Sequence, residues 1–285
     1  MARKTIFDML DTEMNLNEEI SRLRVLCGQE VIEGGDDSWC PEYSYTLEKF
    51  VDEYCFFRWK HRSRCLDCAD MRRKLNISDI SMREELNDER IITYLEYLAN
   101  MIWLCDNYLY RDRKFFSSTK YYAGLKENFA QILDSMNYEE RVFEEEEKVL
   151  LVEKNVAVTA VAEIVEPQLA YDIIQYNHYL LKGDIEGKRK ILNLLADKIE
   201  PMRAKFKTLQ RHKELESNVG FLLNKMNIRH NNTEGKNAID YVKNLSDEEL
   251  EYWYDEAYQL ILLCILEHDN LERNENIAEL KTRMG

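Results

Sequence analysis

Residues 246–270 read SDEELEYWYDEAYQLILLCILEHDN, and this stretch decides the fold class of the chain. Ser246 and Glu249 form a capping box, in which each side chain bonds the backbone N–H of the other residue at the first turn of a helix. The run that follows mixes apolar, aromatic and acidic residues and contains neither proline nor glycine. Both features predict a long helix with a tyrosine-rich face.

The rest of the chain shares this scarcity of helix-breaking residues. Its 285 residues include three prolines and nine glycines, so long helices with short connections are expected. Apolar residues recur at helical spacing over 17–26, 46–75, 88–110, 125–137, 158–181, 185–200 and 201–227. Gly183 ends one of these helices, Asp184 caps the next, and Pro201 suits the first turn of the last. We therefore predict an all-α fold, a multi-helix bundle.

An acidic segment near the middle of the chain, NYEERVFEEEEK at 137–148, indicates a domain boundary. We expect two helical halves, an N-terminal helical domain at 1–137 and a C-terminal helical domain at 138–285. Residues 148–166 are rich in β-branched side chains, which favours one short strand or hairpin near 149–154. No partner strand is evident in the sequence, so a helix at 149–154 stays an open alternative.

Composition limits where the protein works and what it binds. No run of about 18 apolar residues is present and no signal-like apolar core follows the N-terminus, so we expect a cytoplasmic protein outside the membrane. Seven cysteines, an odd number, favour reduced thiols. The net charge of −15 argues against non-specific coating of DNA. Motifs for phosphate loops, di-iron centres and zinc proteases are missing, so no cofactor is expected.

A small cluster of histidine and cysteine has two interpretations. His61, Cys65 and Cys68 lie at i, i+4 and i+7, and a helix would place them on one face. Thiolates and imidazole are the usual ligands of zinc, and Cys27 and Cys40 can complete a site. The same three positions also continue the apolar stripe of the helix expected at 46–75. Core packing is therefore the favoured interpretation, with zinc as the alternative.

Aromatic residues gather in two clusters, one within CFFRWKHRSR at 55–64 and one within EYWYDEAY at 251–258. Aromatic rings beside basic residues can stack on nucleic-acid bases. At helical spacing, such rings also form cores or interfaces. We therefore expect aromatic helical faces that pack internally or that bind a protein partner, including a second copy of the chain as a homodimer.

The segment NIRHNNTEG, residues 227–235, concentrates polar side chains between two expected helices. Arg229 offers five fixed donors for a phosphate, and His230 can transfer a proton near neutral pH. Together they can support metal-free cleavage of RNA, with Asn231 and Asn232 binding the substrate strand. The alternative is the end of a helix, where cations face the carbonyl groups and asparagine accepts a left-handed turn.

These residues resemble the motif of the HEPN superfamily, helical domains common in prokaryotic defence and toxin systems. In that family an arginine is followed by a polar residue and then by a histidine, near the end of the domain. Arg229 and His230 match the first two positions, whereas Thr233, Glu234 and Gly235 stand where the histidine would fall. The resemblance covers only the C-terminal region, which is also similar to abortive-infection-type proteins.

The resemblance implies a metal-independent RNase that dimerises across its motif, with Arg229 and His230 as the catalytic residues. Our first hypothesis is therefore a HEPN-like protein that binds or cleaves RNA in defence against phage. The alternative is a non-enzymatic interaction or scaffold protein, based on the net acidity and on the tyrosine-rich helix that starts after Ser246.

Overall fold

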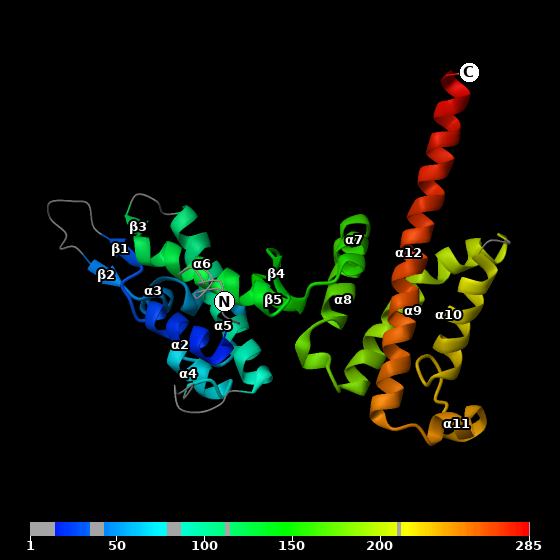
Figure 1. Cartoon of the computed structure of the whole chain (residues 1–285), viewed down its shortest axis with the longest axis horizontal. Coiled ribbons are helices and arrows are strands. Elements are labelled where there is room, and N and C mark those ends of the chain that lie inside the picture. The colour runs from blue at the N-terminus through cyan, green and yellow to red at the C-terminus, as the bar shows by residue number, and fades with distance from the viewer. Residues whose placement is uncertain (1–14, 35–42, 79–86, 112–114, 210–211, 285) are drawn as a thin grey trace, which may run out of the picture. The chain divides into compact units, whose positions relative to one another are not determined.

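The computed structural model describes residues 15–34, 43–78, 87–111, 115–209 and 212–284. These residues form eleven α-helices and two small antiparallel sheets, so the predicted all-α fold class is confirmed. The chain divides into two compact units, unit 1 (Met1–Val152) and unit 2 (Glu153–Gly285) (Figure 1). The predicted domain boundary lies after residue 137, whereas the two compact units meet after Val152. The predicted boundary would place the strands around residue 149 in the second domain, and it stays a prediction.

Unit 1 is organised around α5 (Asp88–Arg111), which carries buried residues around most of its circumference. α3 (Leu47–Tyr54) packs against α5 and α4 (Cys68–Lys74), and α2 (Leu16–Cys27) packs against α6 (Lys120–Ser135). A helix that is apolar on nearly every side must be covered on nearly every side. The helix α5 therefore forms the centre of the core of unit 1.

A three-stranded antiparallel sheet joins distant parts of unit 1, and the sequence does not predict it. β1 (Ile32–Gly34) pairs with β2 (Tyr43–Tyr45) on one side and with β3 (Phe116–Ser118) on the other. The register sets Ile32 opposite both Tyr45 and Ser118. Strands of three residues are too short to display alternating hydrophobicity, which is the usual sign of a strand.

The helix predicted over 46–75 is wrong as a single element. After α3 the chain forms two 3-10 turns, η1 (Phe56–Arg58) and η2 (Lys60–Arg62), before α4 begins. Trp59 lies between these turns with extended backbone angles, and its indole N–H donates to the carbonyl of Glu147 at 2.7 Å. A tertiary contact between residues 88 apart in sequence thus overrides the local helical pattern.

The strand predicted near 149–154 is confirmed, and it belongs to a hairpin. β4 (Tyr138–Phe143) and β5 (Lys148–Glu153) form a two-stranded sheet. Along β5, the side-chain amide of Asn100 donates to the carbonyl of Val149 at 2.8 Å and accepts from its N–H at 2.9 Å. Asn100 is buried in α5, so one helical side chain replaces a missing neighbouring strand.

Unit 2 is assembled on α12 (Asp247–Met284). Three helices pack against it, α9 (Ile185–Lys207), α10 (Lys213–Lys225) and α7 (Val156–Ile164) (Figure 1). The other described elements are α8 (Pro167–Tyr176), α11 (Asp240–Lys243), η3 (Tyr179–Leu181) and η5 (Gly235–Asn237). The predicted capping box is confirmed, because the N–H of Ser246 donates to the Glu249 carboxylate at 2.9 Å and the reverse bond measures 3.2 Å. None of the described helices combines the length and the apolarity that crossing a membrane requires.

The tyrosines of α12 lie mostly inside unit 2. Tyr254 and Tyr258 are buried, and the Tyr258 ring stacks on Tyr176 with centroids 4.1 Å apart. The hydroxyl of Tyr258 donates to the carbonyl of Ile173 at 2.7 Å. A buried tyrosine needs such a partner for its hydroxyl. These rings are therefore part of the core, whereas Tyr252 is exposed.

The helix boundary predicted at Pro201 is wrong. Gly183 has a left-handed φ of 79° and Asp184 caps α9, both as predicted, but α9 continues through Pro201 to Lys207. A proline inside a helix leaves the carbonyl four residues earlier, here that of Asp197, without its helical donor. A side chain from outside the helix, that of Arg229, contacts the turn before Pro201.

Two helical glycines differ in their surroundings, and this difference predicts different effects of alanine. A Cβ at Gly124 in α6 would meet open space, whereas a Cβ at Gly220 in α10 would lie 2.5 Å from a guanidinium nitrogen of Arg203. Alanine is favoured over glycine inside a helix, so Gly124→Ala should raise the free energy of unfolding by about 0.5–1 kcal/mol. Gly220→Ala should give no gain. Denaturant unfolding followed by circular dichroism measures both variants, and equal stabilisation would contradict the packing around Gly220.

Candidate functional site

The segment 227–235 folds as a compact loop after α10. Asn227 has a left-handed φ of 59°, a conformation that asparagine tolerates better than most residues. Its side-chain oxygen accepts from the N–H of Asn232 at 3.0 Å, and the side-chain oxygen of Asn232 accepts from the N–H of Asn227 at 2.9 Å. Buried Asn232 also donates to the carbonyl of Asn237 at 3.1 Å. The polar atoms of Asn232 are therefore used to close the loop.

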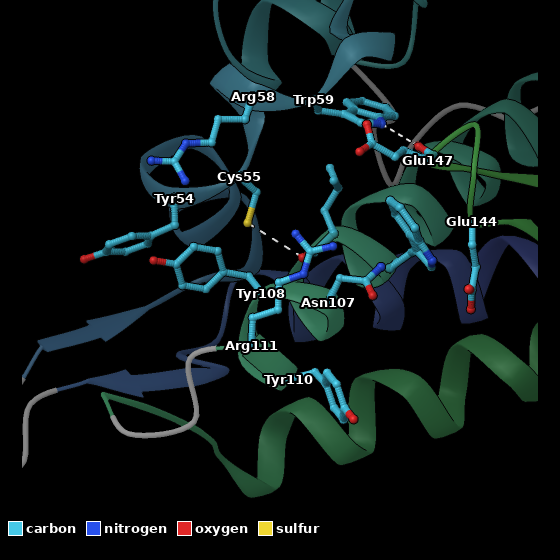
Figure 2. Close-up of a pocket in the computed structure, with 12 residues that line it drawn as sticks. Tyr54, Cys55, Arg58, Trp59, Asn107, Tyr108, Tyr110, Arg111, Glu144 and Glu147 are labelled. Carbon is cyan, nitrogen blue, oxygen red and sulfur yellow. Dashed lines mark hydrogen bonds between the residues drawn. The ribbon is translucent and has the colours of Figure 1, made fainter.

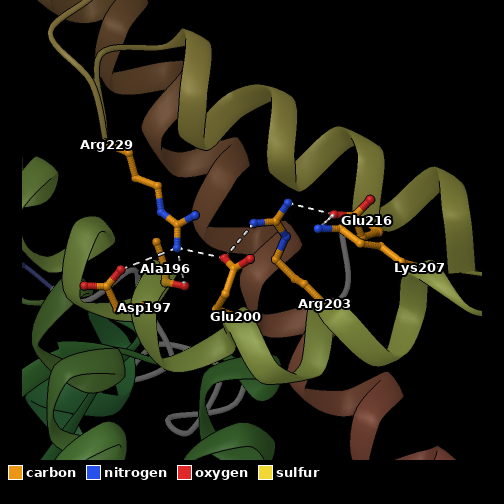
Figure 3. A network of polar contacts seen from close by, with 7 residues as sticks. All are labelled: Ala196, Asp197, Glu200, Arg203, Lys207, Glu216 and Arg229. Atoms are coloured by element: carbon orange, nitrogen blue, oxygen red, sulfur yellow. Dashed lines mark hydrogen bonds and ion pairs between the residues drawn. The ribbon is translucent and has the colours of Figure 1, made fainter.

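Arg229 reaches from this loop to α9 and holds the turn before Pro201 (Figure 3). One guanidinium nitrogen donates to the carbonyl of Ala196 at 2.9 Å and lies 2.9 Å from a carboxylate oxygen of Glu200. The same nitrogen lies 3.4 Å from the carboxylate of Asp197. Pro201 leaves the carbonyl of Asp197 without its helical donor. Arg229 bonds the carbonyl of the preceding residue, Ala196.

Glu200 connects Arg229 to a second arginine, and the network continues to α10 (Figure 3). The buried Arg203 bonds Glu200 at 3.1 Å and Glu216 at 2.8 Å. Burial acts to raise the pKa of the Glu200 carboxyl, but the hydrogen bond from Arg229 and the charges of both arginines outweigh it, so this pKa is lowered. The network therefore ties the loop, α9 and α10 together through charged groups.

His230 and Asn231 are exposed. The side-chain oxygen of Asn231 accepts from the N–H groups of Thr233 and Glu234, both at 3.0 Å, and this arrangement stabilises the turn. The described residues offer His230 no hydrogen bond or ion pair. The four predicted site residues are neighbours in sequence, but their side chains do not converge on one point. Their roles in binding or cleaving RNA stay predictions.

The zinc candidates do not share a helix face. His61 lies in η2, where its ring bonds the carbonyl of Glu146. Cys65 lies in the turn before α4, and Cys68 begins α4 with a thiol whose pKa is raised by burial. Cys40 lies outside the described residues. Within the described ranges, no group of three or more His, Cys, Asp or Glu side chains is placed to hold a metal ion.

Unit 1 contains an open pocket of about 500 Å³ (Figure 2). Its walls come from the end of α3 and η1, from the C-terminal half of α5, and from the turn between β4 and β5. Its aromatic lining consists of Tyr54, Trp59, Trp103, Tyr108 and Tyr110. Pockets that combine aromatic walls with a few polar groups are typical of ligand sites.

The charged groups of the pocket are divided between its walls. Arg58 comes from η1 and Arg111 from the end of α5, whereas Glu144 and Glu147 come from the β4–β5 turn (Figure 2). Both arginines are exposed, and neither forms an ion pair with a carboxylate among the described residues. Glu147 lies 4.0 Å from the ammonium of Lys60. Two guanidinium groups beside aromatic rings suit an anionic ligand that has a flat apolar part.

The thiol in the pocket, Cys55, is not a nucleophile at neutral pH. Burial raises its pKa to about 12, although the positive charge of Arg58 opposes the shift. The thiol donates to the carbonyl of Leu104, with Sγ and oxygen 3.7 Å apart. Only the thiolate reacts as a nucleophile, so this cysteine stays inert at neutral pH. The pocket is therefore better suited to binding than to covalent chemistry.

One signal in the sequence pointed to part of this pocket. The segment CFFRWKHRSR combines aromatic and basic residues, and its Arg58 and Trp59 line the pocket. The other walls come from the end of α5 and from the hairpin turn, which lie far from this segment in sequence. No local pattern connects the three segments, so the pocket itself was not predicted.

Comparisons with known proteins assign no family to this chain. No protein-family model, curated protein or solved structure matches it. The resemblance to HEPN proteins and the activity that it implies therefore stay predictions.

Arg229 and His230 are predicted to differ in their importance for stability. Arg229→Ala should lower the free energy of unfolding by about 1–3 kcal/mol, because Glu200 and the turn before Pro201 lose a charged donor. His230→Ala is the matched control, because it changes an exposed residue of the same loop, and it should shift stability by less than about 0.5 kcal/mol. Differential scanning calorimetry measures both. A large loss for His230→Ala would contradict the exposed, unbonded position of this side chain.

A buried lysine joins α9 to α12. The Lys188 ammonium lies 2.7 Å from the carboxylates of both Glu251 and Asp255, and Tyr176 donates to Asp255 at 2.8 Å. A buried charge is stable only with such partners. Burial acts to raise the pKa of Glu251, but the N–H of Gly183 and the charged Lys188 outweigh it, so this pKa is lowered.

The lowered pKa of Glu251 predicts an acid-sensitive contribution to stability. A carboxyl group with a lower pKa in the folded state stabilises the fold above its ordinary pKa of 4.5, and this stabilisation disappears as the pH falls through the folded-state value. Glu251→Gln should therefore be less stable than the natural protein at neutral pH, and the difference should shrink on acidification. Urea unfolding at a series of pH values measures this difference. A gap that stays constant would contradict the prediction.

Proposed function

We propose that this protein binds single-stranded RNA through the pocket of unit 1 and does not cleave it. The observation that carries the proposal is the pair of guanidinium groups, Arg58 and Arg111, without carboxylate partners among the described residues and beside aromatic rings. RNA offers phosphate groups for the two arginines and flat bases for the aromatic rings. The proposal keeps the ligand that the HEPN resemblance implies and moves the binding site to the N-terminal unit.

Several rings of the pocket have surface open to a base, among them Trp103 and Tyr110, and Tyr54 and Tyr108 are also partly exposed. Tyr110 is 72% exposed and Trp103 is partly exposed, whereas Trp59 is buried and its indole N–H already bonds the hairpin turn. Stacking of a base on an aromatic ring contributes about 1–3 kcal/mol. A pocket of about 500 Å³ has room for one nucleotide of a strand, so stacking and phosphate binding would occur within one nucleotide unit.

The two glutamates determine how a nucleotide would be oriented in the pocket. Glu144 and Glu147 repel phosphate and accept hydrogen bonds from ribose hydroxyl groups or from the amino groups of bases. The phosphate would therefore lie towards Arg58 and Arg111, and the sugar or base towards the hairpin turn. A carboxylate that accepts from the 2′-hydroxyl favours RNA over DNA.

Binding is favoured over cleavage because the carboxylates of the pocket, Glu144 and Glu147, come from a different wall than the arginines proposed to hold the phosphate. Metal-free cleavage needs groups that move protons beside the phosphate. No histidine is among the described residues that line the pocket, and Cys55 is protonated at neutral pH. In the C-terminal unit, Arg229 is already bonded to Glu200 and to the Ala196 carbonyl. A role in phage defence rests on the HEPN resemblance alone, and a cytoplasmic location suits the free thiols of the described cysteines.

Fluorescence anisotropy with a labelled single-stranded oligoribonucleotide tests the proposal. Arg58→Ala and Arg111→Ala should each weaken binding about tenfold, because each removes a charge-assisted contact to phosphate. Two phosphate contacts to a single strand predict a slope of about −1.4 in log affinity against log salt concentration. The double variant should bring this slope close to zero.

Matched controls distinguish binding in this pocket from binding elsewhere on the protein. Arg22→Ala removes an exposed arginine of the same unit outside the pocket and should leave the affinity unchanged. A free mononucleotide that binds as tightly as the strand would identify a nucleotide, not RNA, as the ligand. Cleavage of the strand that depends on Arg229 and His230 would overturn the proposal and support a HEPN-type site.

A further inference from the structure

The C-terminal part of α12 carries a regular stripe of six positions, of which the last four are exposed. The stripe consists of six positions separated by alternating steps of four and three residues, Leu266, Asn270, Arg273, Ile277, Leu280 and Met284. This spacing defines the a and d positions of a heptad repeat, which meet a partner helix in a coiled coil. Ile277 is 48% exposed, Leu280 55% and Met284 80%.

The stripe is turned away from the residues of α12 that form the core of unit 2. Tyr254, Ile261 and Ile265 are buried against the unit, and at the helical rotation of 100° per residue the centre of the stripe is turned about 120° away from them. On the side that faces the unit, Lys205 of α9 pairs with Glu275 at 3.1 Å. Residues 272–284 of α12 are exposed, so a second helix can reach this part of the stripe.

We propose that residues 266–284 pair with the same residues of a second copy of this chain, in antiparallel orientation. In an antiparallel pair centred on Glu275, each a position of one helix faces a d position of the other. Three kinds of layer result, and each occurs twice. They are Leu266 with Met284, Asn270 with Leu280, and Arg273 with Ile277.

The charges beside the stripe select the occupant and its orientation. Antiparallel helices bring e positions opposite e positions and g positions opposite g positions. Glu267, whose carboxylate also lies 3.9 Å from the ring of His212, then faces Lys281 of the second copy, and Asp269, which also bonds Arg273, faces Arg283 of the second copy. Both pairs join opposite charges, and symmetry forms each pair twice. The two-fold centre between them carries uncharged asparagines at 274 and 276, so no like charges meet there.

A parallel pair lacks these advantages. It would place Arg273 against Arg273 in one layer, and it would set Lys281 opposite the uncharged Asn276. In the antiparallel pair, Arg273 instead faces Ile277. Its guanidinium group bonds Asp269 of its own helix, so its aliphatic stem can cover the apolar neighbour.

Sedimentation velocity of the full chain over a wide concentration range provides the first test. A reversible monomer–dimer equilibrium is expected, and Leu280→Glu should weaken it by about tenfold or more because a charge enters an apolar layer. Ala278→Glu adds the same charge at an exposed position of the same segment outside the stripe and should leave the equilibrium unchanged. A strict monomer, or a dimer that Leu280→Glu leaves intact, would overturn the proposal.

Charge reversal tests the antiparallel pairing itself. One variant carries Lys281→Glu and Arg283→Glu, and the other carries Glu267→Lys and Asp269→Lys. Each variant alone should be monomeric because like charges meet, whereas an equimolar mixture should form a heterodimer. Failure of the mixture to associate, with both variants folded by circular dichroism, would overturn the antiparallel pairing. The first variant changes only exposed residues, so it stays informative if the second does not fold.

Discussion

Unit 1 depends on side chains that complete the backbone hydrogen bonds of a short hairpin. A two-stranded hairpin is marginally stable in water by itself. Asn100 pairs with both backbone groups of Val149, and the Glu96 carboxylate accepts from the N–H of Leu151 at 2.8 Å. At the far end, Trp59 bonds the turn. The anchored turn then supplies the acidic wall of the pocket, so the shape of the pocket depends on these few contacts.

The same kind of contact explains why residues 227–235 resemble a site. Arginine and asparagine serve catalysis, but they also satisfy backbone groups that helices and turns leave unpaired. Arg229 bonds the Ala196 carbonyl, and Asn232 bonds the N–H of Asn227. Sequence letters do not distinguish these two uses, because both require the same donors and acceptors. In this loop the geometry accounts for most of the polar residues, and His230 stays exposed.

The parts of the fold that the sequence predicted correctly have local causes. The capping box of Ser246 and Glu249 acts within one turn, and so does the cap at Asp184. The predictions failed where the cause lies far along the chain, as at Trp59, where the hairpin turn prevents a continuous helix. The pocket was not predicted because its lining residues come from three segments that lie far apart in the sequence. The heptad spacing at 266–284 is present in the sequence, but a buried helix can show the same spacing, so its exposure is known only from the structure.

The buried cysteines give each unit its own chemical reporter of local opening. Burial raises the pKa of both Cys105 in α5 and Cys264 in α12 to about 12. A protonated thiol inside a core reacts with an alkylating reagent only after the surrounding structure opens. Because these two sulfurs belong to different units, their alkylation rates report two separate opening reactions. The thiols that argue against a disulfide framework thus allow the opening of the two units to be compared at native residues, without an engineered probe.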